Sequence, residues 1–123
     1  MAGTVVDASV FAAIVFREPW EPEATALVAG YEVYAPYLMA FEIANIAVKK
    51  ITRNPSQRIA IFKGVDIMLN ATIHWTAVDY GKTLGLALET GLTAYDASYL
   101  HLARTLGLPL ATFDRKLSVA AQG

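Results

Sequence analysis

The chain has 123 residues, of which 55% are hydrophobic and 17% are charged, and its formal net charge is −1. This length gives room for one domain with a well-packed core, so we expect a single domain over residues 1–123. The absence of cysteine excludes disulfides and thiolate metal sites, and the excess of apolar residues predicts self-association or a protein partner.

Short apolar strands alternate with helices along the chain. Strands are predicted at residues 3–6, 31–35, 73–78 and 108–113, and helices at residues 8–17, 21–29, 37–53, 56–70, 79–90, 93–106 and 115–121. This alternation is typical of an α/β domain with a mainly parallel sheet. The longest apolar run, Ala8–Phe16, is too short to span a bilayer and follows Asp7 rather than a basic segment. We therefore expect no membrane anchor, no signal peptide and a cytoplasmic location.

Local residues predict where several helices begin and end. Thr93 is expected to cap the helix at 93–106, and Gly107 is expected to end it. Ser9 is a candidate cap for the helix at 8–17. The helix at 56–70 is expected to bury one apolar stripe. That stripe consists of Ile59, Phe62, Val65 and Leu69.

Two acidic residues end predicted strands. Asp7 follows the first strand, and Asp114 follows the last. Because the carboxyl ends of parallel strands share one edge of the sheet, where α/β proteins place their ligands, both acids are candidates for a functional site. The alternative for Asp7 is that it only caps the following helix.

Two further acids interrupt the apolar stripes of helices. Asp96 shares its helical face with Tyr99 and Leu100, and Glu42 lies between Leu38 and Ile46. An unpaired carboxylate on such a face is costly to desolvate, so each acid is expected to have a partner. The alternatives are that Asp96 only complements the helix dipole and that Glu42 pairs with a lysine two turns away, a spacing that makes a poor ion pair.

The four acids have one simple common explanation. If they converge, their mutual repulsion requires protons or a cation, and carboxylate oxygens favour Mg²⁺ or Mn²⁺. Such a site polarises a phosphate oxygen and generates a nucleophilic water for in-line phosphoryl displacement. Other chemistries lack their motifs, because His74 and His101 are far apart in the sequence and there is no nucleophilic serine motif or glycine-rich phosphate loop. Tyr31, Tyr34, Tyr95 and Tyr99 are expected to pack rather than to stack on bases.

The residues around these acids form four motifs in order along the chain. They are Val5–Ser9, Glu42 with Asn45, Leu92–Tyr99 and Leu110–Leu117. Together they resemble the successive motifs of PIN-domain ribonucleases, and most closely the VapC-type toxins of bacterial and archaeal toxin–antitoxin pairs. The resemblance extends from Asp7 to Lys116 and therefore covers nearly the whole chain.

The resemblance implies a PIN-like three-layer α/β/α sandwich and a metal-dependent endoribonuclease. It implies an acidic cluster of Asp7, Glu42, Asp96 and Asp114 around Mg²⁺ or Mn²⁺. Ser9 and Thr112 match hydroxyl positions that lie beside the metal or support its ligands, and Asn45 matches a polar position near the same pocket. A homodimer is implied as well, together with an antitoxin whose C-terminal segment covers the site.

The net charge does not exclude an RNA substrate. Eleven acids oppose ten cations, so setting four acids aside in a metal site leaves about +3 on the rest of the chain. Cations that could hold the RNA backbone are Lys49, Lys50, Arg53 and Arg115. The alternative for all four is an ordinary solvated surface.

Three other functions remain as alternatives. A receiver-type phosphoacceptor module would need paired acids after the first strand and a lysine after a late strand, whereas this chain has Asp7-Ala8 and Asp114 at those places. A PIN-like fold that only binds and regulates is a second alternative. A structure-specific DNA nuclease is a third, although such enzymes usually have longer chains.

Overall fold

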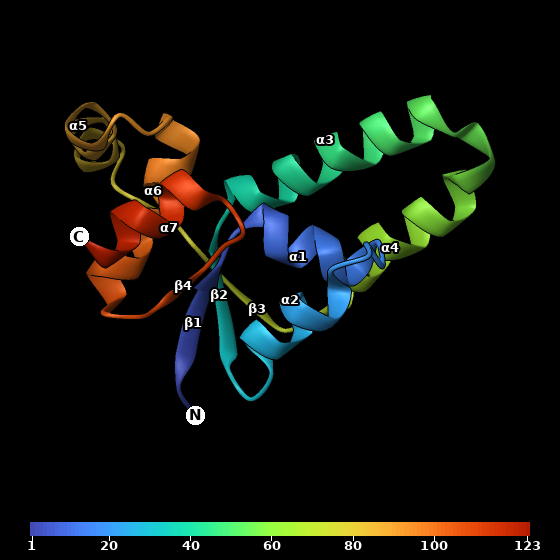
Figure 1. Cartoon of the computed structure of the whole chain (residues 1–123), viewed down its shortest axis with the longest axis horizontal. Coiled ribbons are helices and arrows are strands. Elements are labelled where there is room, and N and C mark those ends of the chain that lie inside the picture. The colour runs from blue at the N-terminus through green and yellow to red at the C-terminus, as the bar shows by residue number, and fades with distance from the viewer.

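The computed structural model describes all 123 residues and shows an α/β fold with seven α-helices and a four-stranded parallel sheet (Figure 1). The strands are β1 (Gly3–Val6), β2 (Glu32–Pro36), β3 (Ile73–Thr76) and β4 (Leu110–Ala111), in the spatial order β3-β2-β1-β4. All three strand pairs are parallel, which confirms the predicted sheet.

Helices cover both faces of the sheet. On one side lie α1 (Ala8–Val15), α2 (Glu21–Val28), α3 (Leu38–Arg53) and α4 (Arg58–Asn70), and on the other lie α5 (Tyr80–Thr90), α6 (Ala94–Leu106) and α7 (Arg115–Gln122). A short 3-10 turn at Pro55–Gln57 joins α3 to α4, and the two helices extend away from the sheet as a hairpin (Figure 1). This arrangement confirms the predicted three-layer α/β/α sandwich. No helix combines the length and the apolar character that crossing a membrane requires.

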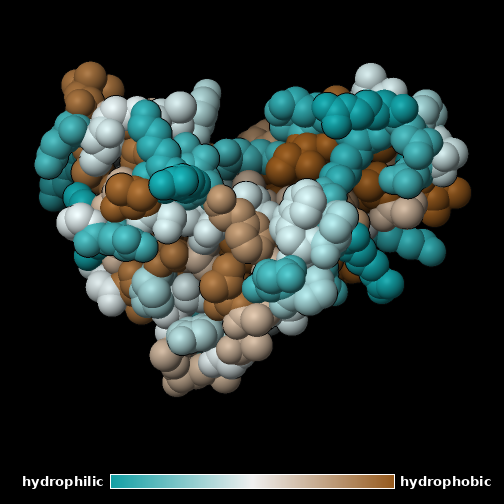
Figure 2. All heavy atoms as spheres, in the orientation of Figure 1, coloured by the Kyte–Doolittle hydropathy of each residue, from teal (hydrophilic) through white to brown (hydrophobic).

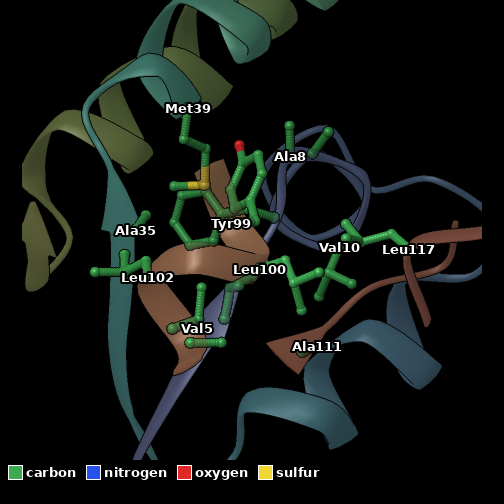
Figure 3. Packing of buried hydrophobic residues seen from close by; sticks show 14 of the residues in the cluster. Val5, Ala8, Val10, Ala35, Met39, Tyr99, Leu100, Leu102, Ala111 and Leu117 are labelled. Carbon is green, nitrogen blue, oxygen red and sulfur yellow. The ribbon is translucent and has the colours of Figure 1, made fainter. Parts of the chain in front are cut away.

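The central strand and α6 form the middle of the hydrophobic core. All four residues of β1 are buried, because β2 and β4 pair with its two edges and helices cover its faces. In Figure 3, side chains of the sheet and of α6, such as Val5, Leu100 and Leu102, pack together. The ring of Tyr99 lies beside Met39 and Ala8, and its hydroxyl points out of this cluster (Figure 3).

The predicted ends of α6 are confirmed, whereas the predicted cap of α1 is wrong. The Thr93 hydroxyl accepts a hydrogen bond from the backbone N–H of Asp96 at 3.1 Å, and Gly107 ends α6 with a φ of 66°. In α1 the cap is Asp7, whose Oδ1 accepts from the backbone N–H of Val10 at 3.2 Å. The Ser9 hydroxyl instead donates to Asp7.

The last strand is shorter than the sequence predicts. Only Leu110 and Ala111 pair with β1, although the apolar run extends to Phe113. The chain leaves the sheet because the Thr112 hydroxyl donates to Asp7 and accepts from the backbone N–H of Asp114. These hydrogen bonds take the place of further backbone pairing with β1, and they direct the chain toward the start of α7.

The predicted buried stripe of α4 is wrong for three of its four residues. Ile59, Phe62 and Leu69 are 73%, 52% and 67% exposed, whereas Val65 packs against the core as predicted. The fully buried residues of α4 are Ile61, Gly64 and Met68. Gly64 explains the difference, because a Cβ atom there would lie 2.6 Å from the carbonyl oxygen of Val15. The missing side chain lets α4 approach α1 closely, and this contact sets which face of α4 is buried.

This close contact predicts opposite effects for two glycine-to-alanine substitutions. Gly64→Ala should lower the free energy of unfolding by about 1–3 kcal/mol, because the new methyl group overlaps the backbone of α1. Gly85→Ala in α5 should raise it by roughly 0.5–1 kcal/mol, since its Cβ meets no atom within 4 Å and alanine favours a helix. Urea unfolding measures both, and equal changes would contradict the proposed cause of the α4 register.

Candidate active site

Four carboxylates from separate parts of the chain line one cleft of about 320 Å³. Asp7 follows β1, Glu42 lies in the second turn of α3, Asp96 lies in the first turn of α6, and Asp114 precedes α7. The cleft lies at the carboxyl edge of the sheet. In Figure 2 the surface is indented between the part formed by α5–α7 and the part formed by α3 and α4. The remaining polar residues of the cleft are Ser9, Asn45, Lys49 and Tyr99.

Asp7 is the most buried of the four acids, with only 4% of its surface exposed. Its Oδ1 accepts hydrogen bonds from the Ser9 hydroxyl at 2.6 Å and from the backbone N–H of Val10. Its Oδ2 accepts from the Thr112 hydroxyl. Burial raises the pKa of Asp7 above its usual value, and these hydrogen bonds oppose the increase because they favour the ionised form.

The two hydroxyl groups also connect Asp7 to the loop before α7. The Ser9 oxygen accepts from the backbone N–H of Phe113 at 3.1 Å, and the Thr112 oxygen accepts from that of Asp114 at 2.9 Å. Asp114 in turn caps α7 by accepting from the backbone N–H of Leu117 at 2.8 Å. One buried carboxylate thus fixes the start of α1 and the position of a second acid.

Glu42 is held by a tyrosine from the opposite side of the fold. The Tyr99 hydroxyl donates to Oε1 of Glu42 at 2.6 Å. Burial raises the pKa of Glu42, the Tyr99 hydroxyl lowers it, and the charges of Asp96 and Asp7 raise it. Burial and the charge of Glu42 together raise the pKa of Tyr99, so Tyr99 remains a hydrogen-bond donor at neutral pH.

Asp96 and Asp114 form the more open side of the cleft. Burial raises the pKa of Asp96, and the charges of Asp114 and then Asp7 raise it further. The Thr93 side chain and the ammonium of Lys116 lower it. The acids of this cleft therefore repel one another, and a cation between them would relieve that repulsion.

The family model described as PIN domain matches residues 4–123. The chain belongs to the PIN domain family. This membership, with the first relative below, confirms the resemblance to VapC-type PIN-domain proteins that the four motifs predicted.

Two relatives and one solved structure from Pyrobaculum aerophilum are similar to this PIN domain. The chain is 31% identical to ribonuclease VapC3 over 119 residues, which are 93% of this chain and 91% of that protein. It is 48% identical to exonuclease VapC9 over 42 residues, or 34% of this chain and 32% of that protein. The crystal structure of PAE2754 has a TM-score of 0.81 and 25% identity, and the match covers 99% of this chain and 81% of that one.

The donor atoms of the PIN-domain cleft suit a hard divalent cation. The charged ligands available are carboxylates, with the amide of Asn45 beside them. Neither histidine lines the cleft, since His74 stacks on Tyr34 at 4.5 Å and His101 lies beside Thr105. No three of these acids and histidines stand close enough together to form a ready-made metal site. The donor chemistry therefore fits Mg²⁺ or Mn²⁺, and binding would require the carboxylates to move closer together.

The four cations considered for RNA binding lie in different places. Lys49 lines the acidic cleft. Lys50 forms an ion pair with Glu18 instead. Arg53 ends α3, about 16 Å along the helix axis from Glu42, and Arg115 lines a separate hollow between α6 and α7.

Sequence reasoning missed the second role of Tyr99 and the place of Lys116. Tyr99 packs as predicted, with 1% of its surface exposed, but its hydroxyl also fixes Glu42. The spacing of Asp96 and Tyr99, three residues apart on one helix, could have indicated that Tyr99 faces the same cleft. Nothing in the sequence indicates that the charge of Lys116 lowers the pKa of Asp96, because this effect depends on how α6 and α7 pack.

The hydrogen bond between Tyr99 and Glu42 predicts a shift in the titration of Glu42. Because the folded pKa of Glu42 exceeds its unfolded value, the free energy of unfolding falls as the pH rises through the folded pKa. Tyr99→Phe removes a donor that favours the ionised form, so the pKa of Glu42 should rise further and this loss should extend to higher pH. Carbon-13 NMR titration of the carboxyl groups in chelator measures the change.

Tyr95→Phe is the matched control for this titration. Tyr95 lies in the same helix, its ring is exposed, and its hydroxyl does not contact Glu42. An unchanged Glu42 titration in Tyr99→Phe, or an equal shift in both variants, would show that the hydroxyl does not hold Glu42.

Proposed function

We propose that this PIN domain is a metal-dependent endoribonuclease that hydrolyses phosphodiester bonds of RNA. The observation that carries the proposal is the cleft in which four carboxylates from separate elements meet. Membership of the PIN domain family supports a nuclease, and the similarity to ribonuclease VapC3 over 93% of the chain supports RNA as the substrate. The combination favours catalysis over a PIN-like fold that only binds, because a binding module has no need for four repelling carboxylates.

The residues of the cleft have different proposed roles. Asp7, Glu42, Asp96 and Asp114 would hold Mg²⁺ or Mn²⁺, which would polarise a phosphate oxygen as a Lewis acid and lower the pKa of water. The Ser9 and Thr112 hydroxyls fix the orientation of the Asp7 carboxylate, so Asp7 would set where the cation binds in the cleft.

Glu42 is the acid best suited to take a proton from the attacking water. Its pKa is raised by burial, which makes the carboxylate a stronger base. Tyr99 occupies Oε1 and leaves Oε2 without a partner from the protein. Lys49, which lines the same cleft, is placed to hold a phosphate oxygen of the substrate.

We propose further that the chain is the toxin of a toxin–antitoxin pair and forms a homodimer. The name VapC3 of the relative supports this assignment. Large apolar side chains are exposed on three helices, and such side chains are typical of surfaces that other proteins cover. They include Phe41 and Val48 on α3, Ile59 and Leu69 on α4, and Tyr80, Leu84 and Leu88 on α5.

The first prediction of this function is metal-dependent cleavage of cellular RNA. The purified protein should cleave total RNA with Mg²⁺ or Mn²⁺ and should not cleave it in excess chelator. Asp96→Asn should lower the rate by roughly 100-fold or more, because it removes one charge from the acid cluster. Gel electrophoresis of labelled RNA over time measures the rate.

Asp66→Asn serves as the control for charge and for contamination. Asp66 is an exposed acid on α4, outside the cleft, and its variant should cleave RNA as the unmodified protein does. Cleavage that persists in Asp96→Asn would indicate a contaminant or a wrong site. Failure of the protein both to cleave RNA and to bind Mn²⁺ in calorimetry would favour a non-catalytic module.

A second prediction concerns the bond that breaks. Attack by water should give 5′-phosphate and 3′-hydroxyl ends, since the 2′-hydroxyl does not take part. A circular RNA should be opened, because an endonuclease needs no free end. Enzymatic end mapping and electrophoresis of the circle measure these outcomes.

Three results would contradict this second prediction in different ways. Products with 2′,3′-cyclic phosphate would show that the 2′-hydroxyl is the nucleophile. A circle that stays intact while linear RNA is shortened would indicate an exonuclease, the activity named for VapC9. Preferential cleavage of flap DNA over RNA would favour a structure-specific DNA nuclease.

A further inference from the structure

A second hollow, of about 640 Å³, lies between α6 and α7, and three cations line it. Arg104 comes from the last turn of α6, and Arg115 and Lys116 come from the first turn of α7. Val119 and Ala120 supply apolar surface from the next turn of α7. We call this region the basic hollow.

Backbone oxygens, and not carboxylates, accept hydrogen bonds from two of these three cations. None of the three forms a salt bridge, unlike Lys50, which pairs with Glu18. The Lys116 ammonium donates to the backbone oxygen of Gly91 at 2.6 Å, and Nη2 of Arg104 donates at 3.4 Å to that of Ala120. These backbone contacts orient the side chains and leave most of their N–H groups free for an anion.

The basic hollow begins where the acidic cleft ends. Asp114 lines the cleft, and the next two residues of the chain line the hollow. The ammonium of Lys116 donates to the backbone oxygen of Gly91, three residues before α6 and its Asp96, so it lies near the helix that carries an acid of the cleft. A polyanion held at the open side of the acidic cleft can therefore continue over the first turn of α7.

We propose that the basic hollow binds backbone phosphates of the RNA strand that neighbour the phosphate being cleaved. A guanidinium group can hold two phosphate oxygens at once, and the hollow offers two of them with an ammonium beside them. Phosphates recur at every nucleotide, so one strand can occupy both sites. The aliphatic surface of Val119 and Ala120 suits a ribose between two phosphates. The identity of the polyanion as RNA rests on the proposed function.

The test measures RNA binding without cleavage. A short, fluorescein-labelled, mixed-sequence single-stranded RNA is titrated with protein in chelator, and its anisotropy is followed at several salt concentrations. Arg104→Gln combined with Arg115→Gln should weaken binding at least tenfold. The slope of log affinity against log salt should become shallower by roughly 0.7 for each phosphate that the double variant no longer holds.

Arg58→Gln combined with Lys63→Gln is the matched control. Both residues are exposed on α4, away from the basic hollow, and the pair removes the same total charge. This control should change the affinity less than twofold, and circular dichroism should show that both double variants stay folded. Equal weakening by both pairs, or no weakening by the first pair, would overturn the proposal.

Two additional arms separate this proposal from its alternatives. In one arm, polyglutamate replaces RNA. If the double variant loses binding to polyglutamate but keeps its binding to RNA, the hollow binds an acidic protein partner instead. In the other arm cleavage is measured with Mg²⁺. If RNA binds through the hollow but is never cleaved, the proposed nuclease function is overturned and the proposed RNA site in the hollow stands. If the double variant changes neither cleavage nor binding, only the proposed RNA site is overturned.

Discussion

The hydrogen bonds of the buried Asp7 carboxylate are the interaction on which the rest of the site depends. Desolvating this charge is unfavourable, and the Ser9 and Thr112 hydroxyls and a backbone N–H of α1 offset the cost. The same two hydroxyls accept from backbone N–H groups of the loop before α7. One side chain therefore joins the central strand, the first helix and the loop that carries Asp114.

Helix N-termini let the fold tolerate several acids in one place. Asp7 and Asp114 cap α1 and α7, and Asp96 lies in the first turn of α6, so three of the four carboxylates face the positive end of a helix dipole. Glu42 lies one turn further into its helix, and it is the acid with a tyrosine donor. The acids that remain in repulsion face the cleft, which Lys49 also lines, and three further cations lie beyond Asp114 in the basic hollow.

The sequence predicted the parallel sheet and the meeting of the acids, because both follow from local pattern and from the geometry of strand ends. It did not predict the register of α4, which depends on the close approach of Gly64 to α1 and not on the apolar residues around it. The contact between Tyr99 and Glu42 joins residues 57 positions apart, and the basic hollow depends on the packing of α6 against α7. Helix and strand propensity and hydrophobic periodicity describe single elements, so they cannot predict contacts between side chains of different elements.

Tyr99 belongs to the hydrophobic core by its ring and to the cleft by its hydroxyl. A lineage that loses the acid at position 42 leaves a buried phenol without an acceptor, which is destabilising until the phenol is lost as well. Evolution should therefore exchange Tyr99 and Glu42 together, with phenylalanine following the loss of the acid. Among descendants of this chain, the aromatic residue at position 99 would then show whether the acidic cleft had been retained or lost.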